Sequence, residues 1–301
     1  MNNNCPVCNH EQVRLESNCQ DFEYEYPGFF SLYQCPRCGL GELEPKLMTG
    51  ELLRAYPKEY HGYNYARVKS KIFNTLQRLR LKKRLAFYKS LIGDNARILD
   101  IGCGDGHYMD YFAKRTNWHF VGVEFNSEIA NVGISEGRSI YIGTFENADF
   151  PDDYFDLVIM DHLLEHVSSP VELLKKAKRK LKPGGYVIGE LPNIASWDFI
   201  LSKKYWGGLH APRHLYDFTP ASLSLTVQQA GFDNCQITYN LNTSHWALSA
   251  QNYFQSTKLF KSKLRYGRTK YYNLLLIVFI PINFIAKIFK KTGIINFIIK
   301  K

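Results

Sequence analysis

The sequence predicts an α/β protein with a parallel, Rossmann-like sheet. Three observations support this fold class. Short apolar runs alternate with helical patterns from residue 97 to residue 191, which is typical of a parallel sheet covered by helices on both sides. A glycine-rich turn follows the first apolar run, and the second run ends in an acidic residue, Glu124. The chain of 301 residues is long enough for one domain of about 200 residues with appendages.

The expected elements follow in chain order. The apolar runs predict strands at 97–101, 119–123, 139–142, 155–160, 186–191, 232–240 and 293–300. Helical patterns predict helices at 67–91, 107–115, 127–136, 171–181 and 220–230. Thr219 caps the last of these helices, and Pro183 and two glycines end the helix at 171–181.

The glycine-rich turn predicts a ligand site. Three glycines let the backbone turn tightly and approach a ligand that any Cβ would obstruct, and the helix that follows directs its N–H groups at the ligand. Glu124 stands about 20 residues further on, where a carboxylate can accept hydrogen bonds from both hydroxyls of a ribose. Asp100 would repel a pyrophosphate and suits a ligand with an amino group and a sulfonium. The glycines are Gly102, Gly104 and Gly106.

This Asp-x-Gly-x-Gly-x-Gly stretch resembles the first motif of class I S-adenosylmethionine-dependent methyltransferases. The resemblance covers residues 97–240 and implies S-adenosylmethionine as cofactor, with the last strand antiparallel beside the one at 232–240. It also implies that the segment from Gly143 holds the adenine. The family often has Asp at the position of Thr144, so we expect the backbone of Phe145 and the side chain of Glu146 to substitute.

Polar residues follow the strand at 155–160. Side chains beyond the carboxyl ends of parallel strands face the ligand, so Asp161 is assigned to the cofactor and His162 and Glu165 to the acceptor. On one face of a helical turn, His162, Glu165 and His166 could also bind a divalent cation. The run resembles the Glu-His-Val motif of ubiquinone-pathway O-methyltransferases, with His162 in place of a Glu. The alternative to a catalytic or metal-binding role is that Glu165 and His166 form a hydrogen-bonded pair that caps the start of the helix.

The loop from Trp206 to Thr219, which we call the histidine loop, is the candidate acceptor pocket. It holds His210, Arg213, His214 and Tyr216, which is a rich chemistry for a connecting loop. We expect Arg213 and Tyr216 to contact the acceptor and His214 to act as general base, with His210 second and His166 as the alternative. A loop packed only by its aromatic residues is the competing interpretation.

Two Cys-x-x-Cys pairs predict a zinc knuckle. Four thiolates at this spacing can close a tetrahedral shell around one structural zinc ion, and so small a module needs a metal to be stable. Aromatic residues between the pairs alternate as half-buried strands would. The absence of a signal peptide at Met1 predicts a reducing, cytoplasmic location. The cysteines are Cys5, Cys8, Cys35 and Cys38.

Positive charge is concentrated near the C-terminus. The net charge is +10, but residues 234–301 contain 11 Lys and Arg and no acid, and the rest carries 27 basic and 28 acidic residues. The apolar stretch 274–286 is shorter than the roughly 20 residues of a spanning helix, and Pro281 and Asn283 interrupt it. We expect this segment to lie on an anionic membrane surface; a buried helix or a dimer contact is the alternative.

The expected organisation is a zinc-ribbon-like module at 1–45, a linker and basic helix at 46–93, and a methyltransferase domain at 94–301 with a membrane-associating insertion near 271–291. In combining a zinc knuckle, the histidine loop and this insertion, the chain resembles methyltransferases of bacterial surface-polysaccharide pathways. The resemblance implies methylation of a hydroxyl on a sugar, free, nucleotide-linked or lipid-linked, at the cytoplasmic face of the inner membrane. The alternatives are a ubiquinone-type O-methyltransferase and an RNA methyltransferase. The RNA methyltransferase is disfavoured because the excess of basic residues lies in the tail. A nucleic-acid partner is therefore not expected. A non-catalytic interaction protein ranks last.

Overall fold

The structure is a computed structural model that describes residues 4–47, 51, 54–57, 60, 71–257 and 263–301. Its main sheet has seven strands in the order β10-β11-β8-β7-β4-β5-β6. The four inner pairs from β8 to β6 are parallel, and β11 runs antiparallel between β8 and β10. This order confirms the predicted fold class. The strands are β4 (Arg97–Ile101), β5 (His119–Glu124), β6 (Ile140–Ile142), β7 (Phe155–Asp161), β8 (Leu181–Pro192), β10 (Cys235–Tyr239) and β11 (Ile294–Lys300).

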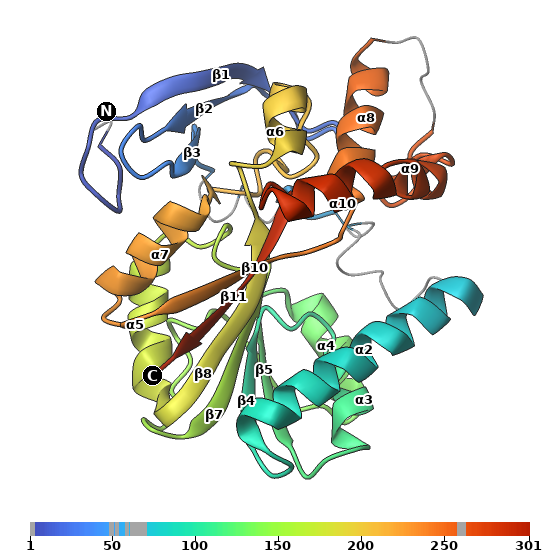
Figure 1. Cartoon of the computed structure of the whole chain (residues 1–301). Coiled ribbons are helices and arrows are strands. Elements are labelled where there is room, and N and C mark those ends of the chain that lie inside the picture. Colours follow the sequence, from blue (N-terminus) through green and yellow to red (C-terminus); the bar gives the residue numbers. More distant parts are fainter. Residues whose placement is uncertain (1–3, 48–50, 52–53, 58–59, 61–70, 258–262) are drawn as a thin grey trace.

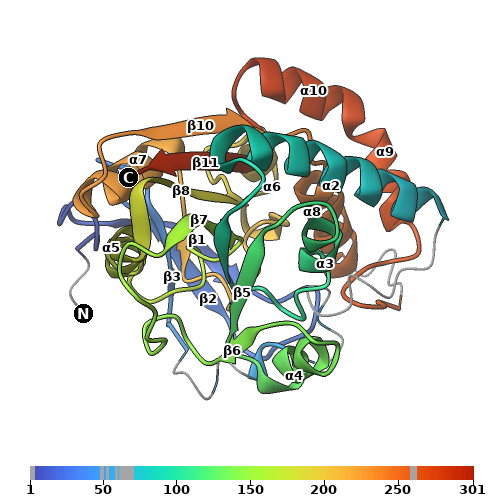
Figure 2. The same cartoon turned by 90° about the horizontal axis from the view of Figure 1, so that it is seen from below.

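Helices cover both faces of this sheet. α5 and α7 lie on one face and α2, α3 and α4 on the other (Figures 1 and 2). The helix expected at 107–115 is shorter than predicted, and of the helix expected at 67–91 residues 67–70 lie outside the described residues. The bounds are α2 (Lys71–Ile92), α3 (Met109–Ala113), α4 (Ser127–Ser135), α5 (Pro170–Lys180) and α7 (Pro220–Gln229).

A second sheet stands beyond the carboxyl ends of the parallel strands (Figure 1). It contains β1 (Val13–Cys19), β2 (Phe30–Gln34) and β3 (Gly41–Glu44), and its fourth strand is β9 (Tyr216–Asp217) from the histidine loop. β3 and β9 pair antiparallel. The cysteine-rich module therefore shares a sheet with the loop expected to bind the acceptor.

The strands expected among the aromatic residues between the cysteine pairs are only partly correct, because residues 22–24 form a turn. The cause is Asp21, whose carboxylate accepts hydrogen bonds from the backbone N–H groups of Glu23, at 3.0 Å, and Tyr24, at 3.1 Å. Such an Asp-centred turn competes with strand pairing.

The remaining helices gather beside the second sheet. α6 (Trp197–Ser202) and the 3-10 turn η3 (Lys203–Tyr205) follow β8, and α8 (Ser244–Ser256) follows β10. The apolar stretch forms two short helices, α9 (Tyr272–Val278) and α10 (Ile280–Ile288), with Pro281 in the first turn of α10. Among the described residues, no helix has the length and apolar character needed to cross a membrane.

Candidate active site

The first part of the site is the glycine turn between β4 and α3. Gly102, Gly104 and Gly106 have φ angles of +79°, +60° and +67°, which L side chains rarely adopt. Among the described residues, a Cβ at Gly104 would meet no atom closer than 4.0 Å, so these residues leave space beside the turn. Backbone shape and space thus agree with the ligand-binding role that the sequence predicts.

Glu124 closes this turn from the end of β5. Its carboxylate accepts a hydrogen bond from the backbone N–H of Gly104 at 2.9 Å and another from that of Asn126 at 2.9 Å. The two bonds fix the orientation of the side chain, while each carboxylate oxygen retains capacity to accept a further bond. Fixed in this way, Glu124 is ready to receive a diol.

Two acids, the buried Asp100 and the half-buried Asp161, lie near the ends of the neighbouring strands β4 and β7. Asp100 accepts a hydrogen bond from the hydroxyl of Tyr108, and Asp161 forms an ion pair with Arg84 of α2. Burial raises the pKa of Asp100 to about 7 and also raises the pKa of Asp161. A ligand that brings a positive charge next to Asp100 would favour its ionised form.

The predicted adenine segment forms a turn after β6. The side chain of Phe145 is buried in the core, whereas that of Glu146 is exposed. The carbonyl of Glu146 accepts a hydrogen bond from Lys176 at 2.8 Å. This leaves the Phe145 backbone and the Glu146 carboxylate as the groups on which the adenine prediction rests.

His162 follows β7 directly, in a left-handed conformation with φ of +49°. Its ring lies 3.1 Å from Glu165 and 3.3 Å from Glu190. Burial opposes the charged form, but the bonds to the two carboxylates raise the pKa of His162 well above its usual value. The helix expected here does not form: residues 164–168 form turns and bends, because the positive φ of His162 interrupts a helix at its start. His162 is thus a positive bridge between two acids.

Three histidines from two loops lie side by side. The ring of His214 is 4.6 Å from that of His166 and 4.9 Å from that of His210. Burial lowers the pKa of His166 to about 4 and that of His214 well below its usual value. The structure therefore brings together the three residues proposed as general base, and it keeps His166 and His214 neutral at physiological pH.

Arg213 holds this loop against the N-terminal module. Its guanidinium is fully buried and pairs with both carboxylate oxygens of Asp21, at 2.7 and 2.9 Å, and it donates a hydrogen bond to the carbonyl of Ala55 at 3.0 Å. These partners make Arg213 a positioning residue of the loop, in place of the acceptor contact that the sequence predicts.

Tyr216 is also engaged within the protein. It is buried, its hydroxyl donates to the carbonyl of Ser168 at 3.1 Å, and it accepts a hydrogen bond from Lys46 at 3.0 Å. His210 pairs with Glu23 at 3.0 Å. The predicted acceptor contact of Tyr216 is therefore replaced by a link between the loop and the N-terminal module.

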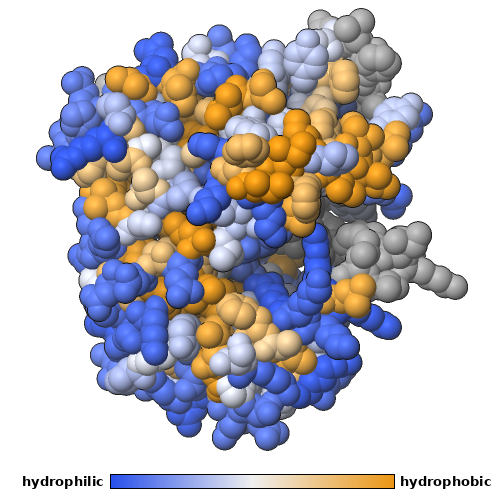
Figure 3. Space-filling model, in the orientation of Figure 1, coloured by the Kyte–Doolittle hydropathy of each residue, from blue (hydrophilic) through white to orange (hydrophobic). Residues whose placement is uncertain are grey.

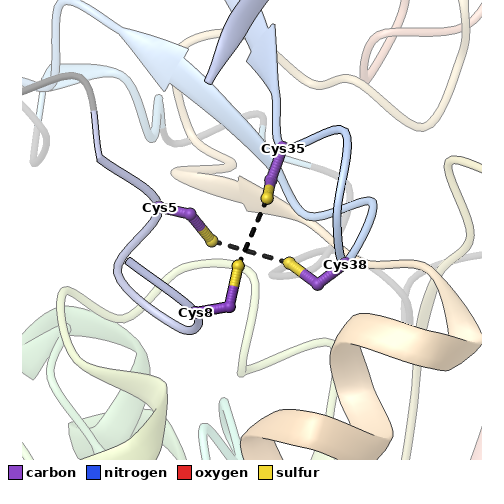
Figure 4. Close-up of side chains that lie close together, drawn as sticks. All are labelled: Cys5, Cys8, Cys35 and Cys38. Carbon is purple, nitrogen blue, oxygen red and sulfur yellow. Dashed lines mark hydrogen bonds between the residues drawn. The ribbon is translucent and has the colours of Figure 1, made fainter. Parts of the chain in front are cut away.

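The two cysteine pairs meet at one point. Figure 4 shows the four Sγ atoms directed toward one another. Cys5 and Cys38 are 3.6 Å apart and Cys8 and Cys35 are 3.3 Å apart, and all four Sγ atoms lie within 4.8 Å of one another. These spacings are close to those of sulfurs that surround a zinc ion at about 2.3 Å. The residues fit a four-cysteine zinc site.

A second group of potential ligands differs from the one expected. Glu165, His166 and His214 place one ligand atom each within 4.8 Å of one another. His214 takes the place in this group that the sequence gives to His162, whose ring instead bridges Glu165 and Glu190.

Comparison with known proteins identifies the family. The model of the methyltransferase domain family matches residues 67–237, more than half of the chain. The chain belongs to this methyltransferase family. A protein of unknown function from Methanocaldococcus jannaschii is 34% identical over 148 residues, which cover 48% of this chain and 68% of that protein. The sterol 4-C-methyltransferase of Caenorhabditis elegans is 26% identical over 54% of each chain.

Further relatives agree with this assignment. The ubiquinone/menaquinone biosynthesis C-methyltransferase of Geotalea daltonii is 27% identical over 51% of this chain and 77% of its own length. A methyltransferase structure from Thermotoga maritima superposes with a TM-score of 0.51 at 20% identity and covers 81% of this chain and 98% of its own. That likeness shows the fold. The match spans about half the length of the Caenorhabditis elegans enzyme.

The residues at the glycine turn suit the cofactor of this methyltransferase. S-adenosylmethionine carries an amino group, a sulfonium and a ribose diol, and its sulfonium supplies an electrophilic methyl group when bound. Asp100 would provide a carboxylate for a positive charge, and Glu124 would provide a fixed acceptor for the diol. The methyltransferase is thus an S-adenosylmethionine-dependent enzyme whose turn, strand ends and acids fit the cofactor.

Sequence reasoning missed several residues around the site. Arg84 belongs to a helix whose basic residues suggest a solvated face, yet it contacts Asp161. Tyr56 hydrogen-bonds His166 at 2.8 Å, and its ring packs on Phe125, 5.7 Å away, next to Glu124. For Tyr56 the tyrosine-rich linker predicts either a cover over the methionine end of the cofactor or packing against the next helix, but not the bond to His166. Nothing local in the sequence points to Asp21.

Proposed function

We propose that this methyltransferase transfers a methyl group to a hydroxyl of a sugar that is carried on a nucleotide or a lipid, in the assembly of a surface polysaccharide. The observation that supports this most is the row of histidines formed by His166, His214 and His210. A sugar hydroxyl has a pKa far above neutral and needs a base as it attacks, and a neutral histidine is suited to that task.

His214 is the first candidate for this base. Its ring is buried between the other two histidines, and within the described part of the chain its Nδ1 has no hydrogen-bond partner. His210 comes second because it pairs with Glu23, and His166 is the alternative because its Nδ1 lies 3.0 Å from the carbonyl of Arg213. The remaining contribution is positioning, since an in-line attack needs the hydroxyl about 3 Å from the methyl group.

A groove between β1, η3 and α8 favours an acceptor with a hydrocarbon chain. It has a volume of about 580 Å³, and aromatic side chains such as Trp246, Tyr253 and Phe279 line it together with Lys203 and Lys204. Lys204 also lines a small crevice that reaches His210. Apolar walls suit a lipid chain and lysines suit a phosphate, so the groove supports a lipid-linked sugar and with it an enzyme at the cytoplasmic face of the inner membrane.

A structural zinc ion belongs to this proposal. Cys5, Cys8, Cys35 and Cys38 would hold it, and Thr219, which caps α7, donates a hydrogen bond to the carbonyl of Cys38 at 3.0 Å. The metal would thereby stabilise the start of α7 and the neighbouring loop. Elemental analysis of protein purified under reducing conditions should find one zinc per chain in the wild type and less in Cys8→Ser. Metal-free wild-type protein would contradict the assignment.

A second candidate is a lipid acceptor without a sugar. The relatives from Caenorhabditis elegans and Geotalea daltonii are named as a sterol 4-C-methyltransferase and a ubiquinone/menaquinone biosynthesis C-methyltransferase. A divalent cation at Glu165, His166 and His214 would assist methylation of an oxygen of such an acceptor by lowering the pKa of a bound hydroxyl. The RNA-methyltransferase alternative has less support, because the basic excess lies after residue 233.

The deciding experiment supplies labelled S-adenosylmethionine with three acceptor fractions: nucleotide sugars, lipid-linked sugars, and quinone or sterol precursors. Label in either sugar fraction, lost in His214→Ala, is the expected result. Label only in the precursor fraction would replace the sugar proposal by the second candidate. A variant with Val132→Ala, an exposed residue of α4, serves as the matched control and should label like the wild type.

A further inference from the structure

Helix α10 buries a polar residue against the protein and exposes its bulky apolar residues, which is the reverse of an ordinary surface helix. Asn283 and Ala286 face the protein and are 1% and 0% exposed. Asn283 donates a hydrogen bond to the carbonyl of Asn242 at 3.3 Å. The bulky residues of the same helix face outward, and Ile288 is 66% exposed. A helix that meets water presents the reverse pattern.

Helix α9 extends this surface. Ile277 is 65% exposed, and orange residues gather over both helices in Figure 3. Phe279, between the helices, stacks on Trp246 at 5.5 Å and thereby anchors them to α8. We call the exposed set the apolar face; it consists of Leu274, Ile277, Val278, Ile280, Phe284, Ile285, Ile288 and Phe289. Contiguous exposed apolar residues of this kind mark interaction surfaces.

The charges around the apolar face indicate what covers it. Lys270 precedes α9, Lys287 lies on α10 and Lys290 follows it, and all three are exposed. No acid occurs between residues 234 and 301. A second copy of the chain in a two-fold dimer would bring these positive charges toward one another, which is unfavourable. An anionic lipid surface matches both the apolar residues and the lysines.

We propose that the apolar face lies in the interface of an anionic lipid bilayer, with Lys270, Lys287 and Lys290 near the phosphates of the headgroups. Long lysine side chains can keep their ammonium groups at headgroup level while α9 and α10 are immersed. The association that we propose is peripheral, with α9 and α10 lying along the surface of the bilayer. The inference deepens the proposed function by naming the surface where a lipid-linked acceptor would be met.

The test is flotation of the full chain with vesicles, in the absence of any acceptor. Vesicles of phosphatidylglycerol and phosphatidylcholine are compared with phosphatidylcholine alone, at low and at high salt. We expect binding to the anionic vesicles that weakens with salt. The variant I277D/I288D should bind at least tenfold less, and K287Q/K290Q about fivefold less per lysine removed. The control F29D/V132D places two acids on exposed apolar residues elsewhere and should float like the wild type.

Three results would overturn the proposal. One is a wild-type protein that stays unbound with anionic vesicles at low salt. Another is equal flotation of I277D/I288D and the wild type. The third is a lipid-free dimer that I277D/I288D dissociates, which would assign the face to a second copy. Flotation requires no methyl transfer, so this inference and the proposed acceptor can fail separately.

Discussion

The two ends of the active site are built in different ways. At the cofactor end, Glu124 reaches the backbone of Gly104 across 20 positions of the sequence, within one strand-turn-helix-strand unit. At the acceptor end, Arg213 pairs with Asp21 across 192 positions. The geometry of the cofactor end is set by neighbouring elements of the main sheet. The geometry of the acceptor end depends on how the N-terminal module docks. Cofactor binding and acceptor chemistry should therefore respond to different substitutions.

The sharpest separation is expected from His214→Ala. Loss of a general base lowers turnover by about 10²–10⁴-fold, whereas the glycine turn and its acids are untouched. Steady-state kinetics with the acceptor identified in the labelling experiment would measure this change in turnover. His10→Ala, which removes an exposed histidine of the N-terminal module, should keep wild-type turnover. Wild-type turnover in His214→Ala would remove the residue from the mechanism.

The docking of the N-terminal module is tested by Arg213→Ala. The substitution leaves Asp21 buried without its partner, which should lower the free energy of unfolding by about 3–5 kcal/mol. Urea unfolding measures it. Arg78→Ala, at an exposed position of α2, should change it by less than about 0.5 kcal/mol. An Arg213→Ala protein as stable as the control would show that the ion pair does not hold the loop. The variant D21N/R213M, which removes both charges, should recover part of the loss.

The sequence predicts the geometry around the glycine turn well, because its determinants are local. Glycines, strand ends and acids follow one another at spacings that the backbone geometry requires. For the acceptor end, the sequence shows which residue types are present but not how they are arranged. His166, His210 and His214 are visible as chemistry, but the contacts of Arg213 with Asp21 and of β9 with β3 depend on a fold between distant segments. The two short helices after residue 271 were missed as separate elements, since an apolar run alone does not show where a proline begins a new helix.

The cofactor end is tested by Asp100→Ala. A lost charged acceptor costs about 1.5–3 kcal/mol, which is roughly a ten- to hundredfold weaker affinity for S-adenosylmethionine. Turnover at saturating cofactor should fall less than in His214→Ala. Calorimetric titration measures the affinity, with Glu172→Ala, at an exposed acid of α5, as the control. An unchanged dissociation constant would exclude Asp100 from the cofactor site.

A smaller effect is expected from pH. Because burial raises the pKa of Asp100 to about 7, the acid is largely protonated in the free protein below that pH. A cationic cofactor favours the ionised form, so its affinity should weaken as pH falls from 8 to 6, by at most tenfold per pH unit. Titrations at pH 8, 7 and 6 measure this, and Asp100→Asn should remove most of the dependence. Equal affinities of the wild type across this range would contradict the assignment.

The separation of the two ends is tested most directly by titrating S-adenosylmethionine into Glu124→Ala and His214→Ala side by side, in one buffer at pH 8. Glu124 contacts the glycine turn, whereas the ring of His214 packs on His166 and His210 in the loops beyond the strands. We predict a dissociation constant about ten- to hundredfold higher for Glu124→Ala and unchanged for His214→Ala. Unchanged affinity in Glu124→Ala, or an equal loss in both variants, would contradict the account.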